Sequence, residues 1–250
     1  MKIPVIRGLI DRRILINYRV DPGVLAAQLP APFRPKLVRG FGMVGICLIR
    51  LAQIRPRGLP AWLGFNSENA AHRTAVEWED QGLTHQGVYV RRRDSNSRLN
   101  ALIGGRVFPG FHHHARFTLD EAADHWNVAL QSDDGVTSLS VRTRRAEGLS
   151  AASIFTSLDE ASAFFAAGSL GYSDAREAGE YQGLELRCRN WQVEPLAVDE
   201  VRSSYFDDLS LFPRGSIQFD NALLMRGIEH EWHGHADLCS VPAGRTYAHH

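Results

Sequence analysis

The chain has 250 residues, of which 44% are hydrophobic and 22% charged, and its 28 basic side chains are balanced by 28 acidic ones. This length is enough for one domain with a large core, and no linker rich in Gly, Ser or Pro interrupts it, so we expect a single domain over residues 1–250. The charge balance argues against a nucleic-acid-binding protein, which needs a basic excess or a concentrated basic face.

The basic residues are unevenly divided between the two types. Lys2 and Lys36 are the only lysines among the 28 basic side chains, so the other 26 are arginines. A genome rich in G and C would produce this bias without selection on chemistry. Its consequence is chemical all the same, because a mechanism that needs a lysine amine has two candidates, both near the N-terminus.

The cysteines and the hydrophobic segments bear on where the protein resides. Three cysteines, an odd number without a CxxC pair, do not form a disulfide framework or a zinc ribbon. They favour a reducing compartment. The N-terminal residues lack the apolar stretch of a signal peptide, and the longest apolar run, 43–49, is far below the roughly 20 residues that span a bilayer. We expect a cytoplasmic protein with no membrane partner.

Alternation of apolar and polar residues dominates the first half of the chain and is typical of half-buried strands. A short helix is expected over residues 22–29, because Asp21 can cap its first turn and Pro22 suits the first helical position. The alternation predicts strands at residues 13–20, 42–54, 66–79 and 87–93.

Two further helices are expected in the rest of the chain. One covers residues 95–104 and ends at a Gly-Gly pair, and the other follows Ser157, which forms a capping-box pattern with Glu160. Strands are predicted at residues 111–119, 126–131, 136–144, 183–193 and 216–236. The fold class is therefore α+β and mainly β.

Consecutive histidines occupy positions 112–114 of a predicted strand. His112 and His114 share one face, while His113 shares the other with Ala115 and Phe117, which indicates that His113 points inward. Two imidazoles could contribute to a zinc or iron site, but no neighbouring carboxylate completes the set. We favour a partly exposed polar strand and predict no metal.

A second histidine cluster, Glu-His-Glu-Trp-His-Gly-His, spans residues 229–235. It differs from the HExxH motif of metalloproteases, because the later histidines lie three and five residues after His230 and a glycine interrupts any helix. On a strand, residues 229, 231, 233 and 235 form one polar face, and His230 and Trp232 lie on the other. A solvated outer face is the simpler explanation of the polar side.

Nucleophile and nucleotide motifs are missing from the sequence. It contains no GxSxG elbow, no GxxxxGK[ST] loop and no GxGxxG that opens a helix. We therefore predict no cofactor.

The predicted strand over residues 66–79 carries several carboxylates and a histidine. Glu68 and His72 share a face, about 13 Å apart, so they do not touch but could line one cavity. The alternative is that this face meets water. Arg73 and Glu77 lie on the opposite face, where ordinary ion pairing is a sufficient explanation.

The order of these motifs is similar to that of a known family. The strand with Glu68 is followed by Gly87-Val-Tyr-Val-Arg91, by the expected helix, and by Arg106-Val-Phe-Pro109 leading into the histidines. The sequence resembles the acetoacetate decarboxylase-like superfamily and, within it, the DUF2071 group, over about residues 10–145.

The resemblance implies a cone-shaped, mainly antiparallel β-barrel that encloses a ligand cavity, with a few peripheral helices and assembly as a homo-oligomer. Acetoacetate decarboxylases form a Schiff base through the first of two adjacent lysines after an aromatic residue and a proline, and the second lysine depresses the pKa of the first. A glutamate that matches Glu68 takes part in their site.

This chain departs from that pattern where the lysines are expected. Gly110 and Phe111 follow Pro109, and the next polar pair is His112 and His113. Imidazole cannot form the protonated imine, and Lys36 could supply an amine only if its proline-bounded segment folded into the cavity. We therefore expect no Schiff-base decarboxylation.

Two hypotheses of function stay open. In the first, the cavity binds a small carboxylate-bearing molecule and acts as a lyase or isomerase through non-covalent acid/base chemistry, with Glu68, His112 and His113 as catalytic residues. The ligand-binding residues would be Arg73, Arg91, Arg106 and Phe111, since an arginine fork matches a carboxylate. In the second, the protein is a small-molecule carrier or sensor that turns nothing over.

Overall fold

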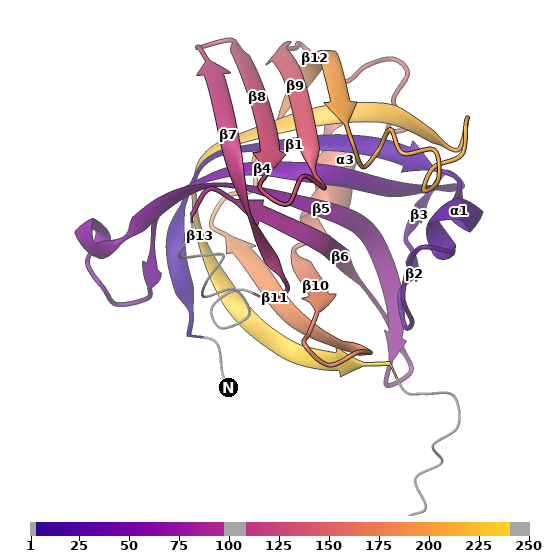
Figure 1. Cartoon of the computed structure of the whole chain (residues 1–250), viewed down its shortest axis with the longest axis horizontal. Coiled ribbons are helices and arrows are strands. Elements are labelled where there is room, and N and C mark those ends of the chain that lie inside the picture. Colours follow the sequence, from indigo (N-terminus) through magenta and orange to yellow (C-terminus); the bar gives the residue numbers. More distant parts are fainter. Residues whose placement is uncertain (1–3, 98–108, 241–250) are drawn as a thin grey trace, which may run out of the picture.

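The computed structural model describes residues 4–97 and 109–240, which form one large mixed sheet with small helices (Figure 1). Four long strands are adjacent and antiparallel in the order β13-β1-β4-β5. They are β1 (Ile6–Val20), β4 (Phe41–Pro56), β5 (Phe65–Asp80) and β13 (Ile217–Cys239). We call these four strands the shared sheet, because both halves of the molecule are built on it.

One face of the shared sheet is closed into a barrel. β6 (Leu83–Ser95) pairs with β5, and β10 (Leu170–Asp174) pairs with β6 in parallel. β11 (Glu180–Cys188) then pairs with both β10 and β13, which completes the circuit of hydrogen-bonded strands. The small helix α3 (Leu158–Ala166) packs its Phe165 into the core on this side.

The opposite face is covered by a meander. β7 (His112–Glu121), β8 (His125–Ser132), β9 (Ser138–Arg145) and β12 (Glu194–Ser203) pair in sequence, with β7 joined to the end of β6 and β12 joined to β13. Figure 1 shows them standing on one side of the long strands, with β10 and β11 on the other. The shorter elements are α1 (Pro22–Ala26), β2 (Arg34–Pro35), β3 (Leu37–Val38) and a 3₁₀ turn at Ala61–Leu63.

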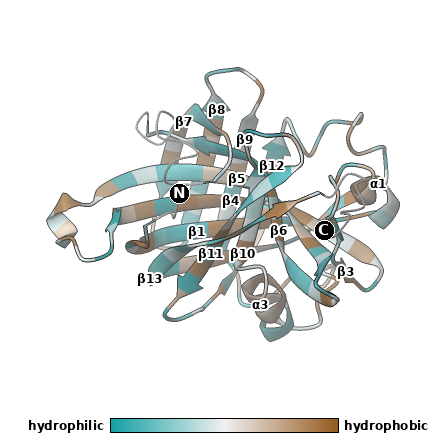
Figure 2. Cartoon of the chain, turned by 90° about the horizontal axis from the view of Figure 1, so that it is seen from below, coloured by the Kyte–Doolittle hydropathy of each residue, from teal (hydrophilic) through white to brown (hydrophobic). Residues whose placement is uncertain are grey.

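The shared sheet is buried on both faces, and its sequence reflects this. In β1, Ile14, Leu15 and Ile16 are all fully buried, although consecutive residues of a strand point to opposite faces. Ile14 and Ile16 contact the meander, and Leu15 faces the barrel beside Cys47. Figure 2 shows the change of hydropathy along these strands. Burial on both faces is what gives a single sheet two separate cores.

The predicted fold class and most of its elements are confirmed. The sheet is mainly antiparallel, with parallel pairing where β6 meets β7 and β10, and helices are few among the described residues. Asp21 caps α1, which is shorter than predicted and ends at Ala26. The Ser157 hydroxyl accepts the amide hydrogen of Glu160, but the Glu160 side chain turns to Thr156 and Arg39 instead of completing the capping box.

Some elements differ from the expectation. Of the helix predicted over residues 95–104, residues 98–104 lie outside the described residues, Ser95 ends β6, and residues 96 and 97 are not helical. The alternation pattern missed β10 and β12, and the predicted strand 183–193 is β11, which ends at Cys188. Within residues 4–97 and 109–240, no helix is long and apolar enough to cross a membrane.

Candidate functional site

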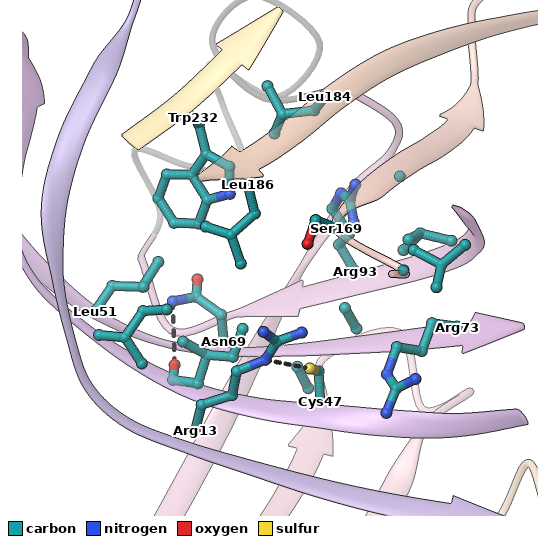
Figure 3. A pocket seen from close by; sticks show the side chains of 18 of the residues that line it. Arg13, Cys47, Leu51, Asn69, Arg73, Arg93, Ser169, Leu184, Leu186 and Trp232 are labelled. Atoms are coloured by element: carbon teal, nitrogen blue, oxygen red, sulfur yellow. Dashed lines mark hydrogen bonds between the residues drawn. The ribbon is translucent and has the colours of Figure 1, made fainter. Parts of the chain in front are cut away.

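A cavity of about 150 Å³ lies inside the barrel, on the face of the shared sheet that α3 covers (Figure 3). Its walls are mostly apolar and come from β1, β4, β5, β6, β7, β10, β11 and β13. The space exists because several of the residues that line the cavity are small. These are Ala71, Gly168, Ser169 and Gly171. The larger apolar side chains around it are Ile10, Ile49, Leu51, Val88, Val90, Leu184, Leu186, Trp191 and Trp232.

Arginines from three strands reach this apolar cavity. Arg13 lies on β1, Arg73 on β5 and Arg93 on β6. None of their hydrogen-bond acceptors in the described structure is a carboxylate: Arg13 Nε contacts Cys47 Sγ at 3.0 Å, Arg73 Nη2 donates to Asn17 Oδ1 at 2.5 Å, and Arg93 Nε donates to the Pro109 carbonyl at 3.0 Å. None of these arginines makes a salt bridge within the described part of the chain.

The backbone explains how Arg73 is held. Asn17, Gly45 and Arg73 are paired across β1, β4 and β5. Because Gly45 has no side chain, the Arg73 side chain can cross it to Asn17, whereas a Cβ at this position would collide with the Ile16 carbonyl. Asn17 in turn donates to Asn221 at 2.8 Å, and the Arg73 guanidinium carbon lies 5.0 Å from the centre of the Phe165 ring. Arg73 is therefore fixed at the cavity wall.

The electrostatics of the cavity favour an anion. Burial lowers the pKa of Arg73, and the nearby Arg13 charge acts in the same direction, while Cys47 opposes them. Burial lowers the pKa of Arg93 to about 10, again opposed by Cys47. Asp94 reaches the cavity edge, but it is bound to Arg92 at 2.8 Å. Because arginine stays protonated in proteins, Arg73 and Arg93 present positive charges that a bound anion would stabilise.

Two of the sequence-predicted site residues line this cavity. Arg73 was expected as a ligand-binding residue, with ion pairing as the alternative explanation, and in the structure it has no acidic partner among the described residues. His112 lines the cavity, whereas His113, which was expected to point inward, contacts Asp134 at 3.1 Å. Ala115 and Phe117 face the core between the shared sheet and the meander, so the face they mark is not that of the cavity.

Glu68 lies on the other face of β5, away from the cavity. It is 6% exposed and forms ion pairs with Arg12 and with Arg50, whose Nε is 2.5 Å away. His72 shares that face, as predicted, and is packed beside the Tyr205 and Phe206 rings with its pKa lowered to about 3 by burial. Neither side chain is part of the cavity wall.

The remaining predicted residues lie elsewhere. Arg91 donates to the Gln28 carbonyl at 2.6 Å, and Phe111 is 57% exposed beside a different surface pocket. Arg106 falls outside the described residues. In the second histidine cluster, the predicted division of faces is confirmed: His230 is buried, Trp232 lines the cavity, and Glu229 and Glu231 pair with Arg7 and Arg57. Among the described residues, no three metal-ligating side chains converge.

Arg13, Arg93 and Cys47 are cavity residues that the sequence interpretation missed. Arg13 and Cys47 each occupy a position whose neighbour two residues away faces the barrel core, as Leu15 does for Arg13 and Ile49 for Cys47. That alternation is the signal that could have found these two residues, and it does not extend to Arg93. It was hidden because residues on both faces of the shared sheet are apolar, so the sequence does not show which face encloses the cavity.

Comparison with solved structures finds the same fold in proteins of low sequence identity. An acetoacetate decarboxylase-like enzyme from Sphingomonas wittichii RW1 is 14% identical, with a TM-score of 0.60 over 96% of this chain and 95% of that one. Acetoacetate decarboxylase from Legionella pneumophila is 14% identical, with a TM-score of 0.58 over 94% and 88%. The enduracididine biosynthesis enzyme MppR, solved with pyruvate, is 11% identical, with a TM-score of 0.55 over 98% and 93%.

The fold is thus that of the acetoacetate decarboxylase-like proteins, as the order of motifs suggested. The match to a family model is more specific. Residues 10–222 match the model of DUF2071, described as an uncharacterised conserved protein, and the chain belongs to this family. A comparison with curated proteins finds no match.

Proposed function

We propose that the cavity binds a small organic acid through its carboxylate group. The observation that carries the proposal is the set of Arg13, Arg73 and Arg93 in an apolar cavity, without an acidic partner among the described residues. A guanidinium matches a carboxylate with two parallel hydrogen bonds, and the pair is stronger where water is excluded. The Arg73 Nε atom has no hydrogen-bond partner in the described structure and is one donor for such a ligand.

The size of the cavity limits the ligand. Its volume of about 150 Å³ is close to that of an engineered apolar cavity that takes up benzene, a molecule of about six non-hydrogen atoms. A short 2-oxo acid such as pyruvate has that size, and the MppR structure contains pyruvate. Leu186, Trp191 and Trp232 would contact its methyl group or short alkyl chain.

The groups near the cavity bear on the reaction class. Lys36 lies with its Nζ atom 4.4 Å from the centre of the Phe164 ring, outside the residues that line the cavity. Of the predicted catalytic residues, His112 is the one at the cavity wall, and it could transfer a proton to or from the bound acid. Isomerisation, dehydration or non-covalent decarboxylation of a small oxo acid would follow from that arrangement.

Binding without turnover is the second candidate function. It is favoured by the position of Glu68, which was expected to act as an acid or base but is held by Arg12 and Arg50 on the opposite face of β5. A carrier or sensor needs the arginines and the cavity alone. Proton NMR of excess pyruvate incubated with the protein in D₂O distinguishes the two candidates, because an enzyme forms a product or exchanges the methyl protons of the free acid and a carrier leaves the free acid unchanged.

Isothermal titration calorimetry tests the binding itself. Pyruvate is compared with methyl pyruvate, which has the same carbonyl and nearly the same shape but no negative charge. We expect pyruvate to bind and the ester to bind at least about 10-fold more weakly, the loss of a charge-assisted hydrogen bond. Equal affinity for the two, or no binding of pyruvate, lactate or propionate, contradicts the proposal. Light scattering separately tests the homo-oligomer that the family resemblance predicts.

A further inference from the structure

Cys47 lies in the wall of the cavity, in the middle of the arginines. It is paired with Leu15 on β1 and with Ala71 on β5, and the small Ala71 side chain leaves space beside the sulfur. The Cys47 side chain is buried, and its Sγ atom lies 3.0 Å from Arg13 Nε (Figure 3). A thiol in this position contacts both a cation and the space that a ligand would occupy.

The surroundings of Cys47 differ from those of a cysteine that serves only as a small apolar residue. Arg13 Nε contacts its sulfur directly, and Arg73 and Arg93 line the same cavity. Cys47 therefore lies among cationic side chains at the wall of a space that fits a small ligand. In contrast, Cys188 packs in the apolar cluster with Ile6 and Leu51, and Cys239 is exposed near the end of β13.

A second observation points to a ligand at the same place. Arg73 is 8% exposed, lines the cavity, and has an Nε atom without a hydrogen-bond partner in the described structure. An unpartnered donor on a buried charged group is unfavourable unless something binds it. A carboxylate held there would place the rest of a short acid inside the same small cavity, which Cys47 also lines.

We propose that Cys47 captures the carbonyl group of a bound 2-oxo acid as a reversible thiohemiketal. This inference rests on the proposed function. The sulfur attacks the ketone carbon, a C–S bond forms, and the C=O double bond becomes a C–O single bond. The proton that the thiol loses ends on the new hydroxyl oxygen, so the step needs no oxidant, reductant or co-reactant.

The cavity supplies what this addition lacks in water. Confinement replaces a bimolecular encounter with an intramolecular one, which raises the effective concentration of the thiol. The arginines stabilise the negative oxygen that forms during the attack. Cys47 would thereby make the site selective for acids that carry a carbonyl, over hydroxy acids and simple carboxylates of the same size.

Carbon-13 NMR with pyruvate labelled at the carbonyl carbon tests the proposal. In the wild-type protein we expect the bound signal to move from the ketone region to that of a tetrahedral carbon. The Cys47→Ser variant should lose this signal, whereas Cys188→Ser and Cys239→Ser should keep it. Bound pyruvate that stays a ketone in the wild type overturns the Cys47 proposal and leaves the proposed function intact, while the absence of any binding overturns both.

Affinity and labelling give a readout that does not depend on one spectrum. The wild type should bind pyruvate about 10-fold more tightly than lactate, and Cys47→Ser should bind the two alike while keeping its affinity for lactate, which also shows that the variant is folded. Iodoacetate should alkylate Cys47 on the order of 10-fold faster than the neutral iodoacetamide, because the arginines attract the anion. Equal affinity of the wild type for pyruvate and lactate, or faster labelling by iodoacetamide than by iodoacetate, contradicts the proposal.

Discussion

Arg12 and Glu68 form a buried ion pair on the face of the shared sheet that points away from the cavity. They are joined through Arg50, which lies between them in register on β4 and contacts Glu68. Glu121 at the end of β7 completes the group, 3.0 Å from both arginines. This cluster of two arginines and two glutamates connects the shared sheet to the meander. Glu68, which the sequence singled out as an acid/base candidate, therefore has a structural role here.

Replacing Glu68 with Gln should therefore destabilise the protein without weakening ligand binding. Removing one carboxylate leaves Arg12 buried with less compensation, and breaking a buried pair in this way costs about 3 kcal/mol of unfolding free energy. Urea unfolding measures the loss, and calorimetry with pyruvate should give the wild-type affinity. The double variant Arg12→Met/Glu68→Leu should recover part of the stability. A stable Glu68→Gln variant that loses turnover would instead make Glu68 an acid/base residue.

Sequence patterns gave the strands more readily than the cavity, for a physical reason. Alternation identifies a strand and divides its residues between two faces, and Glu68 and His72 were correctly assigned to one face. When both faces are buried, the pattern does not show which face packs against a filled core and which face lines a cavity. That choice depends on β10 and β11, which pair far from the N-terminal half in sequence, and on small residues such as Ala71 and Gly171.

Replacing Arg73 with Met should weaken ligand binding while leaving stability unchanged or raised. The variant removes a buried charge that has no acidic partner in the described structure, and burying such a charge is unfavourable for folding. The same charge is a donor for the carboxylate, so we expect affinity for pyruvate to fall about 10- to 100-fold. Arg142→Met on β9, which removes an exposed ion pair with Glu200, is the matched control and should change neither quantity. Loss of both stability and affinity at Arg73 would show a structural role.

His72 and His230 predict a loss of stability in mild acid. Burial lowers the pKa of His72 to about 3 and that of His230 to about 4, below the usual 6.5. The unfolded chain therefore binds protons that the folded one does not, and stability falls as the pH drops below about 6.5. Each histidine should contribute about 2 kcal/mol to the loss between pH 7 and pH 5.

Urea unfolding of the wild type at pH 7 and pH 5 measures this loss. The variants His72→Leu and His230→Leu each remove one titrating group, so each should reduce the difference between the two pH values. An unaltered pH dependence in both buried-site variants would contradict this explanation.

Replacing Ala71 with Leu should abolish binding by filling the cavity. The added carbons would lie beside Cys47 in a space of about 150 Å³, where they would be buried among apolar walls. Because the space exists already, we expect the unfolding free energy to stay within about 1.5 kcal/mol of wild type, less than the penalty of overpacking a full core. Affinity for pyruvate should fall by more than about 10-fold. Ala197→Leu on β12 is the control, and undiminished binding in Ala71→Leu would place the ligand elsewhere.

Lys36 should form no Schiff base with an oxo acid. Burial lowers the pKa of its amine, which by itself would favour reaction with a carbonyl. Its position argues the other way, because the backbone amide of Lys36 is bonded to the Ala75 carbonyl at 3.0 Å and its Nζ atom is seated over Phe164, outside the cavity wall. Incubation with pyruvate and borohydride, followed by mass spectrometry of the Lys36 peptide, should give no added mass. A stable adduct on that peptide, lost in Lys36→Met, would restore lysine chemistry to this protein and reassign the role of Cys47.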